Sequence, residues 1–192
     1  MASDDVEVFR GLTKAFGELG LRWYLFGAQA AILHGAVRFT EDIDVTVDPQ
    51  AVPTPALVAA LAKQGFSPRI ADSGFIERTR VVPLVHEQTS VPVDVVLAGP
   101  GIEELFFEGV TMKDVEDTTI PVARAEDLVV MKVLAGRPKD LDDVIAILAA
   151  QGRAFDRSRT VELLTLLENA LDQRDLLPIF ENAWKRVERS RK

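Results

Sequence analysis

Apolar residues recur at helical spacing near the start of the chain and again from residue 124 onward. The first stripe consists of Val8, Leu12, Ala15, Phe16 and Leu19, and Gly20 marks its end. The later spacing predicts four helices, over residues 124–135, 138–151, 158–170 and 173–190. We therefore expect an N-terminal helix that covers a core and a helical C-terminal region.

Between these helical parts, shorter apolar runs predict β-strands. The expected strands are residues 24–26, 42–47, 66–70, 80–85 and 91–97, followed by two β-like stretches within 110–122. Helices are expected over residues 28–35, 55–64 and 103–107, whereas segment 66–98 is expected to contain only strands joined by polar turns. No linker separates the halves, so the pattern predicts an α/β (α+β) fold with a mixed sheet core in 1–122 and packed helices in 123–192.

Composition favours a soluble globular protein of the cytoplasm. The chain has 192 residues, of which 47% are hydrophobic, enough for a sizeable core. Its apolar runs are too short and interrupted to span a bilayer, and the acidic start MASDDVEVF is unlike a basic signal-peptide leader. We therefore predict no membrane partner. The absence of cysteine excludes disulfides and thiolate sites, and two histidines are too few for a usual zinc site.

The net charge of −8 argues against a broad nucleic-acid surface, because phosphate binding depends on clustered Lys and Arg. A nucleotide is smaller and brings its own magnesium, so this argument does not exclude nucleotide binding. The basic tail at residues 185–192, KRVERSRK, offers contacts to RNA. We favour a solvated helix end, where positive charge suits the C-terminal dipole.

Residues 24–47 carry the most distinctive pattern, which is strand, glycine turn, helix and strand. In the second strand, alternation places Asp42, Asp44 and Thr46 on one face. The Cα atoms of the two aspartates would be roughly 7 Å apart, so both carboxylates can reach one hard cation such as Mg²⁺. The alternative is a solvated strand face, which leaves the mutual repulsion of two carboxylates uncompensated.

Asp94 is a third carboxylate in an otherwise apolar strand, VPVDVVLA. An unpaired charge in such surroundings is costly, so Asp94 is expected to have a partner such as a cation. The alternative is an aspartate on an edge strand that faces water.

The order Gly27-Ala28, short helix, then Arg38-x-Thr40-x-Asp42-x-Asp44 resembles the nucleotidyltransferase signature. The form is that of AbiEii-like and MenT-like toxins and their uncharacterised bacterial relatives. This resemblance implies a nucleotidyltransferase-type mixed sheet with a third carboxylate on a neighbouring strand, a place that Asp94 matches. Many members have Gly-Gly or Gly-Ser where this chain has Gly27-Ala28, so a hydroxyl contact to phosphate is absent and backbone amides would replace it.

A second group of candidate residues lies in the C-terminal region. The stripe Leu128, Met131, Lys132 and Ala135 places a lysine on an apolar helical face, from which it reaches either out to water or into a cleft. The resembling toxins carry a lysine on the equivalent helix, ahead of an Arg/Lys-Asp-Leu-x-Asp motif that is residues 139–143 here.

In the helix that follows, the spacing predicts that Leu141, Val144, Ile145 and Leu148 are buried. Asp140 is then the carboxylate on the core side, whereas Asp142 and Asp143 are expected to be solvated. Because Asp140 also lies in the first helical turn, where the dipole favours negative charge, a purely structural role remains open.

Taken together, the resemblance implies a magnesium-dependent enzyme that transfers an NMP group from an NTP to an acceptor hydroxyl, and suggests the toxin of a toxin-antitoxin system. The expected magnesium ligands are Asp42, Asp44 and Asp94, the expected catalytic residues add Lys132 and Asp140, and the expected nucleotide contacts are Gly27, Ala28, Arg38, Thr40 and Lys132. The alternative is a catalytically silent binding module. The acceptor stays open among tRNA, protein and small molecules, and a cognate antitoxin is an expected partner.

Overall fold

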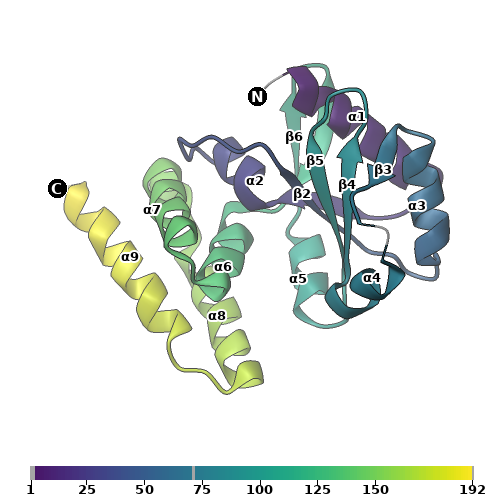
Figure 1. Cartoon of the computed structure of the whole chain (residues 1–192). Coiled ribbons are helices and arrows are strands. Elements are labelled where there is room, and N and C mark those ends of the chain that lie inside the picture. Colours follow the sequence, from purple (N-terminus) through teal and green to yellow (C-terminus); the bar gives the residue numbers. More distant parts are fainter. Residues whose placement is uncertain (1–2, 71, 192) are drawn as a thin grey trace. The chain divides into compact units, whose positions relative to one another are not determined.

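The computed structural model describes residues 3–70 and 72–191 (Figure 1). Its helices are α1 (Ser3–Glu18), α2 (Gly27–Leu33), α3 (Thr54–Ala62), α4 (Ser73–Thr79), α5 (Ile102–Glu108), α6 (Ala125–Ala135), α7 (Pro138–Gln151), the 3-10 turn η1 (Gly152–Ala154), α8 (Arg157–Leu171) and α9 (Leu176–Ser190). Its strands are β1 (Trp23–Phe26), β2 (Ile43–Val47), β3 (Phe66–Pro68), β4 (Val81–His86), β5 (Pro92–Leu97), β6 (Thr111–Val115) and β7 (Thr118–Val122).

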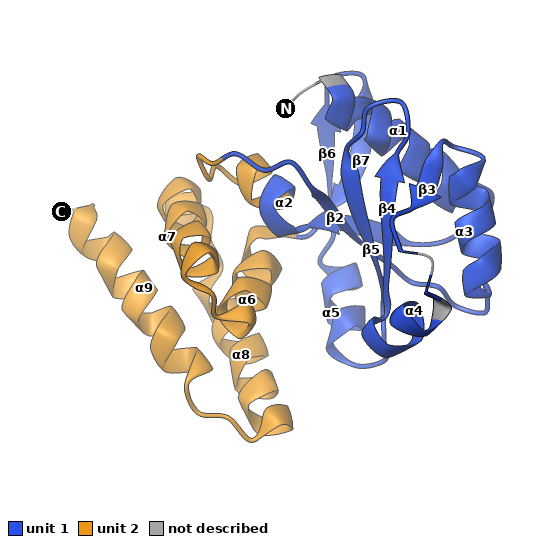
Figure 2. Cartoon of the chain, in the orientation of Figure 1, with its two compact units in different colours: residues 1–29, 39–123 blue, residues 30–38, 124–192 orange. Residues whose placement is uncertain are grey.

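The chain divides into two compact units, which Figure 2 colours separately. Unit 1 comprises residues 1–29 and 39–123 and contains all seven strands. Unit 2 comprises residues 30–38 and 124–192. The sequence-based division assigned residues 30–38 to the first region, whereas in the structure the end of α2 and the following loop belong to unit 2.

Unit 1 is built on one seven-stranded mixed sheet with the strand order β3-β4-β5-β2-β1-β7-β6. The pairs β2–β5 and β1–β7 are parallel, and the other four neighbouring pairs are antiparallel. This arrangement confirms the predicted mixed sheet flanked by helices. It also places β2, which contains Asp44, and β5, which contains Asp94, side by side in the interior of the sheet.

Alternation along β5 decides which of its residues face the core. Val93, Val95 and Leu97 are buried, whereas Asp94 on the opposite face is only half-buried. Of the predicted stripe, Val8, Leu12, Ala15 and Phe16 are fully buried in α1, whereas Leu19 follows the end of the helix and is half-buried. Strands β2 and β5 thus keep one apolar face in the core, and Asp44 and Asp94 lie half-buried on the other.

Segment 66–98 contains a helix that the sequence analysis missed. Helix α4 begins where Asp72 accepts a hydrogen bond from the backbone N–H of Gly74 at 2.9 Å. It ends at Arg80, whose left-handed backbone at φ 56° stops the helix and starts β4 one residue later than predicted. With only seven residues, α4 is too short for its apolar spacing to stand out from a polar turn.

Unit 2 contains helices α6 to α9, as predicted from the helical spacing after residue 124. Helix α6 contacts α7 and α8, and α9 contacts all three of the others. The buried stripe of α9 is Leu176, Phe180, Ala183 and Val187, spaced for one helical face. Within residues 3–70 and 72–191, none of the helices combines the length and apolar character needed to cross a membrane.

Candidate functional site

Gly27, the first residue of α2 directly after β1, lies against the carboxylate of Asp44. Strand β1 pairs with β2 so that Phe26 is opposite Asp44. The backbone of Gly27 has φ +70°, and a Cβ added there would be 2.0 Å from Asp44 Oδ2. Only glycine therefore meets both demands of this turn, a left-handed backbone and close approach of a carboxylate.

Strands β2 and β5 bring two of the predicted ligands together. They are parallel, and Asp44 is the direct partner of Asp94. Neighbouring strands are about 4.8 Å apart, and directly paired residues point to the same face of the sheet. The two carboxylates that sequence analysis expected on neighbouring strands are thus adjacent, although their role as metal ligands stays a prediction.

Asp42 lies one residue before β2 and two residues before Asp44, which places it on the same side of the chain. Its carboxylate accepts a short hydrogen bond from the Thr40 hydroxyl. The predicted nucleotide contact Thr40 is thus next to the predicted magnesium ligand Asp42 and orients its side chain.

Asp94 has a partner that sequence analysis did not identify, because its carboxylate forms an ion pair with Arg69. Arg69 is held by two further contacts, from its Nε to the Leu84 carbonyl at 2.9 Å and from its backbone N–H to the Pro83 carbonyl at 2.9 Å. The alternative of an edge-strand aspartate is wrong, since β5 lies between β4 and β2. The apolar run around Asp94 signalled that a cation was needed, but only the pairing of β3, β4 and β5 shows which cation supplies the charge.

In unit 2, a buried ionic cluster contains the predicted residues Lys132 and Asp140. The Lys132 side chain is 7% exposed, and its Nζ donates to Asp143 Oδ2 at 2.6 Å and to Asp140 Oδ1 at 3.5 Å. Arg38, another predicted residue, donates from Nη1 to the same Asp143 oxygen at 2.6 Å. Arg137 binds the Asp140 carboxylate from the exposed side. Of the two outcomes predicted for Lys132, exposure to water is therefore wrong.

Asp143 corrects a second expectation, because it is 5% exposed rather than solvated. The buried face of α7 consists of Asp140, Asp143, Val144, Ile147 and Leu148. Leu141 and Ile145, which the apolar stripe placed in the core, are only half-buried. The buried face is thus rotated toward the acidic residues, because Lys132 and Arg38 supply the charges that make Asp143 tolerable there.

The charges of the cluster set the protonation of Asp140. Burial raises the pKa of this carboxyl, but the hydrogen bond from Arg137 and the positive charge of Lys132 outweigh it, so the pKa is lowered below the ordinary 3.8. The Asp140 carboxylate is accordingly charged at neutral pH. With three cations and two anions, Arg38, Lys132, Arg137, Asp140 and Asp143 carry one surplus positive charge, the sign that suits a phosphate group.

The donor set in unit 1 fits a magnesium ion in its chemistry. Asp42, Asp44 and Asp94 offer only carboxylate oxygens, which hard divalent cations prefer. Their side chains now bond elsewhere, Asp42 to Thr40 and Asp94 to Arg69. Among residues 3–70 and 72–191, no three acidic or histidine side chains are already gathered around one point. Magnesium binding would therefore require Asp94 to exchange Arg69 for the ion.

A protein-family comparison matches nearly the whole chain. The model described as "Nucleotidyl transferase AbiEii toxin, Type IV TA system" matches residues 12–190. No curated protein matches the chain.

Solved structures of nucleotidyltransferases resemble the fold at low sequence identity. The solution structure of antibiotic-resistance factor ANT(2'')-Ia has a TM-score of 0.61 and is 12% identical, covering 90% of this chain and 95% of that one. A nucleotidyltransferase-like protein from Paracoccidioides brasiliensis has a TM-score of 0.57 at 20% identity, with 96% and 94% covered. The lincomycin-bound lincosamide adenylyltransferase LnuA has a TM-score of 0.52 at 18% identity, with 74% and 94% covered. These structures confirm the predicted nucleotidyltransferase-type fold.

Proposed function

Because the chain belongs to the nucleotidyl transferase AbiEii toxin family, we propose that it transfers an NMP group from an NTP to an acceptor hydroxyl and requires magnesium. The observation that carries the proposal is the register of β2 and β5, which makes Asp44 and Asp94 direct partners. With Asp42 two residues before Asp44, three carboxylates are available on one face. Arg69 offsets the charge of Asp94, and the remaining repulsion among the three carboxylates favours the binding of a further cation.

Asp42, Asp44 and Asp94 would hold the magnesium. Bound magnesium supplies charge neutralisation on the phosphates of the NTP. Thr40 keeps Asp42 oriented through its hydroxyl, and Gly27 leaves room for the Asp44 carboxylate. The chain's own contribution is thus two carboxylates on paired strands, Asp44 and Asp94, with Asp42 directly before the first of these strands.

The reaction proposed is a direct in-line displacement at the α-phosphorus. A bond forms between the acceptor oxygen and the α-phosphorus, the bond from the α-phosphorus to the bridging oxygen breaks, and pyrophosphate leaves. Asp94 is the proposed acceptor of the hydroxyl proton, because it is the carboxylate that exchanges partners. With no cysteine in the chain, a thiol-linked covalent intermediate is excluded, and direct transfer needs none.

The ionic cluster of unit 2 has the charge expected of a phosphate-binding group. Lys132 Nζ is fixed at 2.6 Å from Asp143, and Arg38 shares that carboxylate oxygen. The role proposed for Lys132 is to offset negative charge on the triphosphate, with Asp140 and Asp143 holding its ammonium in place. The backbone amides of Gly27 and Ala28 stay predicted phosphate contacts.

The family also supports a biological role. We propose that the protein is the toxin of a Type IV toxin-antitoxin pair, that it acts in the cytoplasm and that a cognate antitoxin opposes it. One protein of similar fold is an antibiotic-resistance factor, and another is a lincosamide antibiotic adenylyltransferase. The proposed acceptor classes are therefore small molecules with hydroxyl groups, tRNA ends and protein hydroxyls. The net charge of −8 favours the small and protein acceptors over RNA.

Labelled nucleotides test both the reaction and the acceptor. The protein is incubated with magnesium, cellular RNA, protein and small-molecule extract, and NTPs labelled at the α- or the γ-phosphate. We expect α-label to pass into one fraction, to be lost in EDTA and to be lost in Asp44→Asn. Asp114→Asn on the edge strand β6 removes the same charge far from β2 and should keep full activity.

Each alternative gives a different result. Transfer of the γ-label would refute nucleotidyl transfer and indicate a kinase. Full activity in EDTA, or in Asp44→Asn, would refute the magnesium site. Calorimetric titration of magnesium-ATP into the same two variants checks binding independently of the acceptor.

A further inference from the structure

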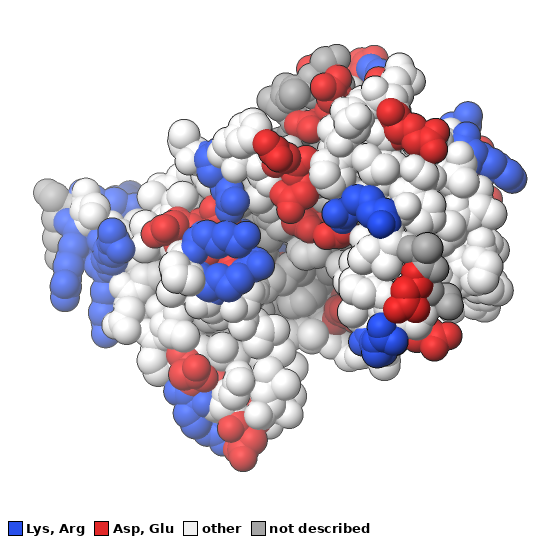
Figure 3. Space-filling view, in the orientation of Figure 1, with Lys and Arg blue, Asp and Glu red and all other residues white. Residues whose placement is uncertain are grey.

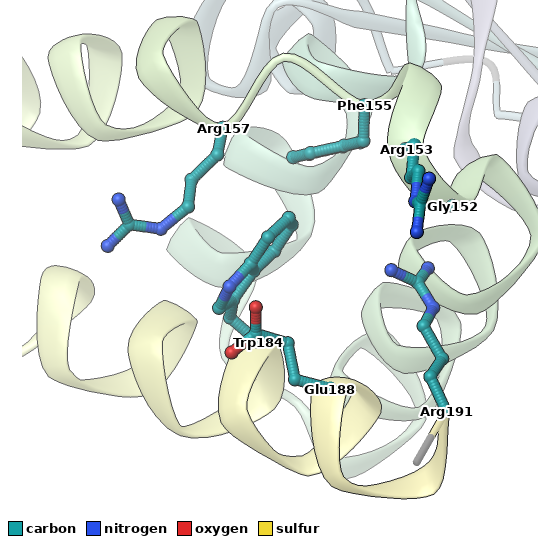
Figure 4. A pocket seen from close by; sticks show the side chains of 7 residues that line it. All are labelled: Gly152, Arg153, Phe155, Arg157, Trp184, Glu188 and Arg191. Carbon is teal, nitrogen blue, oxygen red and sulfur yellow. The ribbon is translucent and has the colours of Figure 1, made fainter.

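Unit 2 contains a pocket that takes no part in the proposed reaction. Its volume is about 530 Å³, which is within the range of small-ligand sites. Figure 4 shows the seven lining residues, which are Gly152, Arg153, Phe155, Arg157, Trp184, Glu188 and Arg191. The pocket thus lies where η1 and the start of α8 meet the second half of α9.

Two arginines at one side of the pocket leave positive charge uncompensated. Figure 4 shows the guanidinium groups of Arg153 and Arg191 pointing toward one another. Arg191 donates to the carbonyls of Leu148 and Ala149 at the end of α7, and within residues 3–70 and 72–191 it pairs with no carboxylate. The Arg153 side chain forms no hydrogen bond or ion pair with residues 3–70 and 72–191. Two like charges that converge on open space favour an anion between them.

The other side of the pocket presents an aromatic surface. The Trp184 indole packs against Phe155, with ring centroids 5.9 Å apart, and is itself half-buried. Arg157 lies over the indole at 5.8 Å, too far for the contact stacking of about 3.5–4.0 Å. Arg157 also pairs with Glu181, so a planar group that stacks on the ring would displace the guanidinium from the indole while this ion pair holds Arg157 beside it.

The carboxylate of Glu188 lies in the same pocket and forms no ion pair within the part of the chain that the structure describes. A site for phosphate alone would not keep a carboxylate in its lining. A nucleobase, by contrast, carries exocyclic amino groups that donate to a carboxylate. The lining therefore offers one partner for each part of a nucleotide: arginines for phosphate, an indole for the ring face and a carboxylate for the ring edge.

We propose that this pocket binds a nucleotide unit, either as a free nucleotide or as one residue of a single-stranded nucleic acid. Stacking on aromatic rings beside arginines is the general chemistry of such binding. The surroundings agree, because residues 185–192 contain five Lys or Arg and one Glu in a chain of net charge −8. Figure 3 shows Lys and Arg side chains gathered at the C-terminal end of α9, the part of the helix that contains Lys185, Arg186 and Arg189.

This pocket is separate from the ionic cluster of unit 2. Asp140 is in the first turn of α7, whereas Gly152 directly follows its last residue. At 1.5 Å per residue, the two ends are roughly 18 Å apart along the helix. The pocket is thus a second site whose occupancy does not depend on the proposed magnesium chemistry.

Binding measured in EDTA tests the proposal without any contribution from a magnesium site. The probes are UMP, AMP, a ten-nucleotide single strand of U, inorganic phosphate and a decamer of glutamate, titrated by calorimetry at 0.15 M salt. Trp184→Ala should weaken nucleotide binding roughly 5- to 150-fold, the usual effect of losing one stacked base. Arg153→Gln should weaken it by about 10-fold or more, as expected for one charge-assisted contact.

Two further variants separate pocket binding from general attraction. Lys185→Gln removes one charge from α9 outside the pocket lining and should weaken binding no more than about threefold at this salt. Trp184→Phe keeps an aromatic face and should retain most of the affinity, even if Trp184→Ala proves too unstable to measure. Equal affinity for UMP and for the U decamer identifies the free nucleotide as the ligand, and tighter binding of the decamer identifies the strand.

Three results would overturn the proposal. The first is that no nucleotide probe binds. The second is binding that Lys185→Gln weakens as much as Arg153→Gln. The third is equal affinity for phosphate or for the glutamate decamer, which would leave the indole and Glu188 without a role. None of these bears on the transfer reaction, which is measured in magnesium with variants of unit 1.

Discussion

Replacement of Gly27 by alanine tests the closest contact in the candidate site. The new Cβ would be 2.0 Å from Asp44 Oδ2, 2.8 Å from its Cγ and 2.9 Å from its Cβ. Rotation of the Asp44 side chain relieves the first two contacts but not the third. Gly27→Ala should therefore both strain the turn and displace the carboxylate that is predicted to bind magnesium.

The expected cost has two parts. A left-handed backbone costs a non-glycine residue roughly 1–2 kcal/mol. Forcing a methyl group into occupied space adds about 1–3 kcal/mol. The free energy of unfolding should thus fall by about 2–5 kcal/mol, and each kcal/mol lowers the Tm of a chain this size by about 2–4 °C.

Gly20 provides a matched control. Its backbone has φ +66°, nearly that of Gly27, but a Cβ added there meets nothing within 4 Å. Gly20→Ala should therefore show only the backbone cost. Urea unfolding of both variants, repeated in an Asp44→Ala background that removes the carboxylate, separates the two parts. In that background only the contact with the Cβ of residue 44 remains, so the cost of Gly27→Ala should fall toward the cost of Gly20→Ala but stay above it, with a coupling of about 1 kcal/mol or more.

Magnesium-ATP titration of the same variants completes the test. Gly27→Ala should lose affinity and Gly20→Ala should keep it. If the two glycine variants cost the same in both backgrounds, and both bind magnesium-ATP normally, the Asp44 carboxylate does not lie against Gly27 and the reasoning fails.

Three other predictions concern the ionic contacts of each unit. Lys132→Met would suit the apolar stripe, but it removes a positive charge from beside the buried Asp143 carboxylate. It should therefore lower the free energy of unfolding by about 3 kcal/mol or more, and unchanged urea unfolding would contradict this. Arg69→Gln should change the free energy of unfolding by less than about 1 kcal/mol, since the Arg69–Asp94 ion pair is partly exposed. It should raise the magnesium affinity measured by calorimetry, because Asp94 is released. Lower affinity would mean that Arg69 instead positions Asp94 for the metal. Asp140 has a lowered pKa in the folded protein, so its charged carboxylate stabilises the fold above pH 3.8, and this stabilisation is lost as the pH falls through the pKa of the folded state. The difference in free energy of unfolding between the parent and Asp140→Asn should therefore be largest near pH 7 and shrink in acid.

Local pattern was sufficient to predict the strand, turn, helix and strand of residues 24–47. Apolar runs, a glycine and strict alternation all lie within a few residues of one another there. The register that pairs Asp44 with Asp94 could not be predicted in this way, because β3, α4 and β4 intervene in the chain. The resemblance to a family, rather than periodicity, indicated that the two strands are neighbours.

Ionic contacts between residues distant in sequence were the hardest features to predict. Arg69 follows a short edge strand and looks like an ordinary surface residue, yet sheet pairing brings it to Asp94. Asp143 lies one position from Val144 on α7, and a stripe drawn through apolar residues alone turned it to solvent. Its burial depends on Lys132 and Arg38, which are distant in sequence. Periodicity treats a charged residue as polar, whereas a paired charge can belong to the core.

The division between the units falls inside the signature itself, since Arg38 belongs to unit 2 and Asp42 to unit 1. Arg38 is fastened to Asp143, while its neighbours Val37 and Phe39 are 100% and 81% exposed. Four residue steps span at most about 14 Å, so the backbone keeps the Cα atoms of Arg38 and Asp42 within that distance of each other. One short segment therefore carries both a cation of the ionic cluster in unit 2 and a predicted magnesium ligand of unit 1.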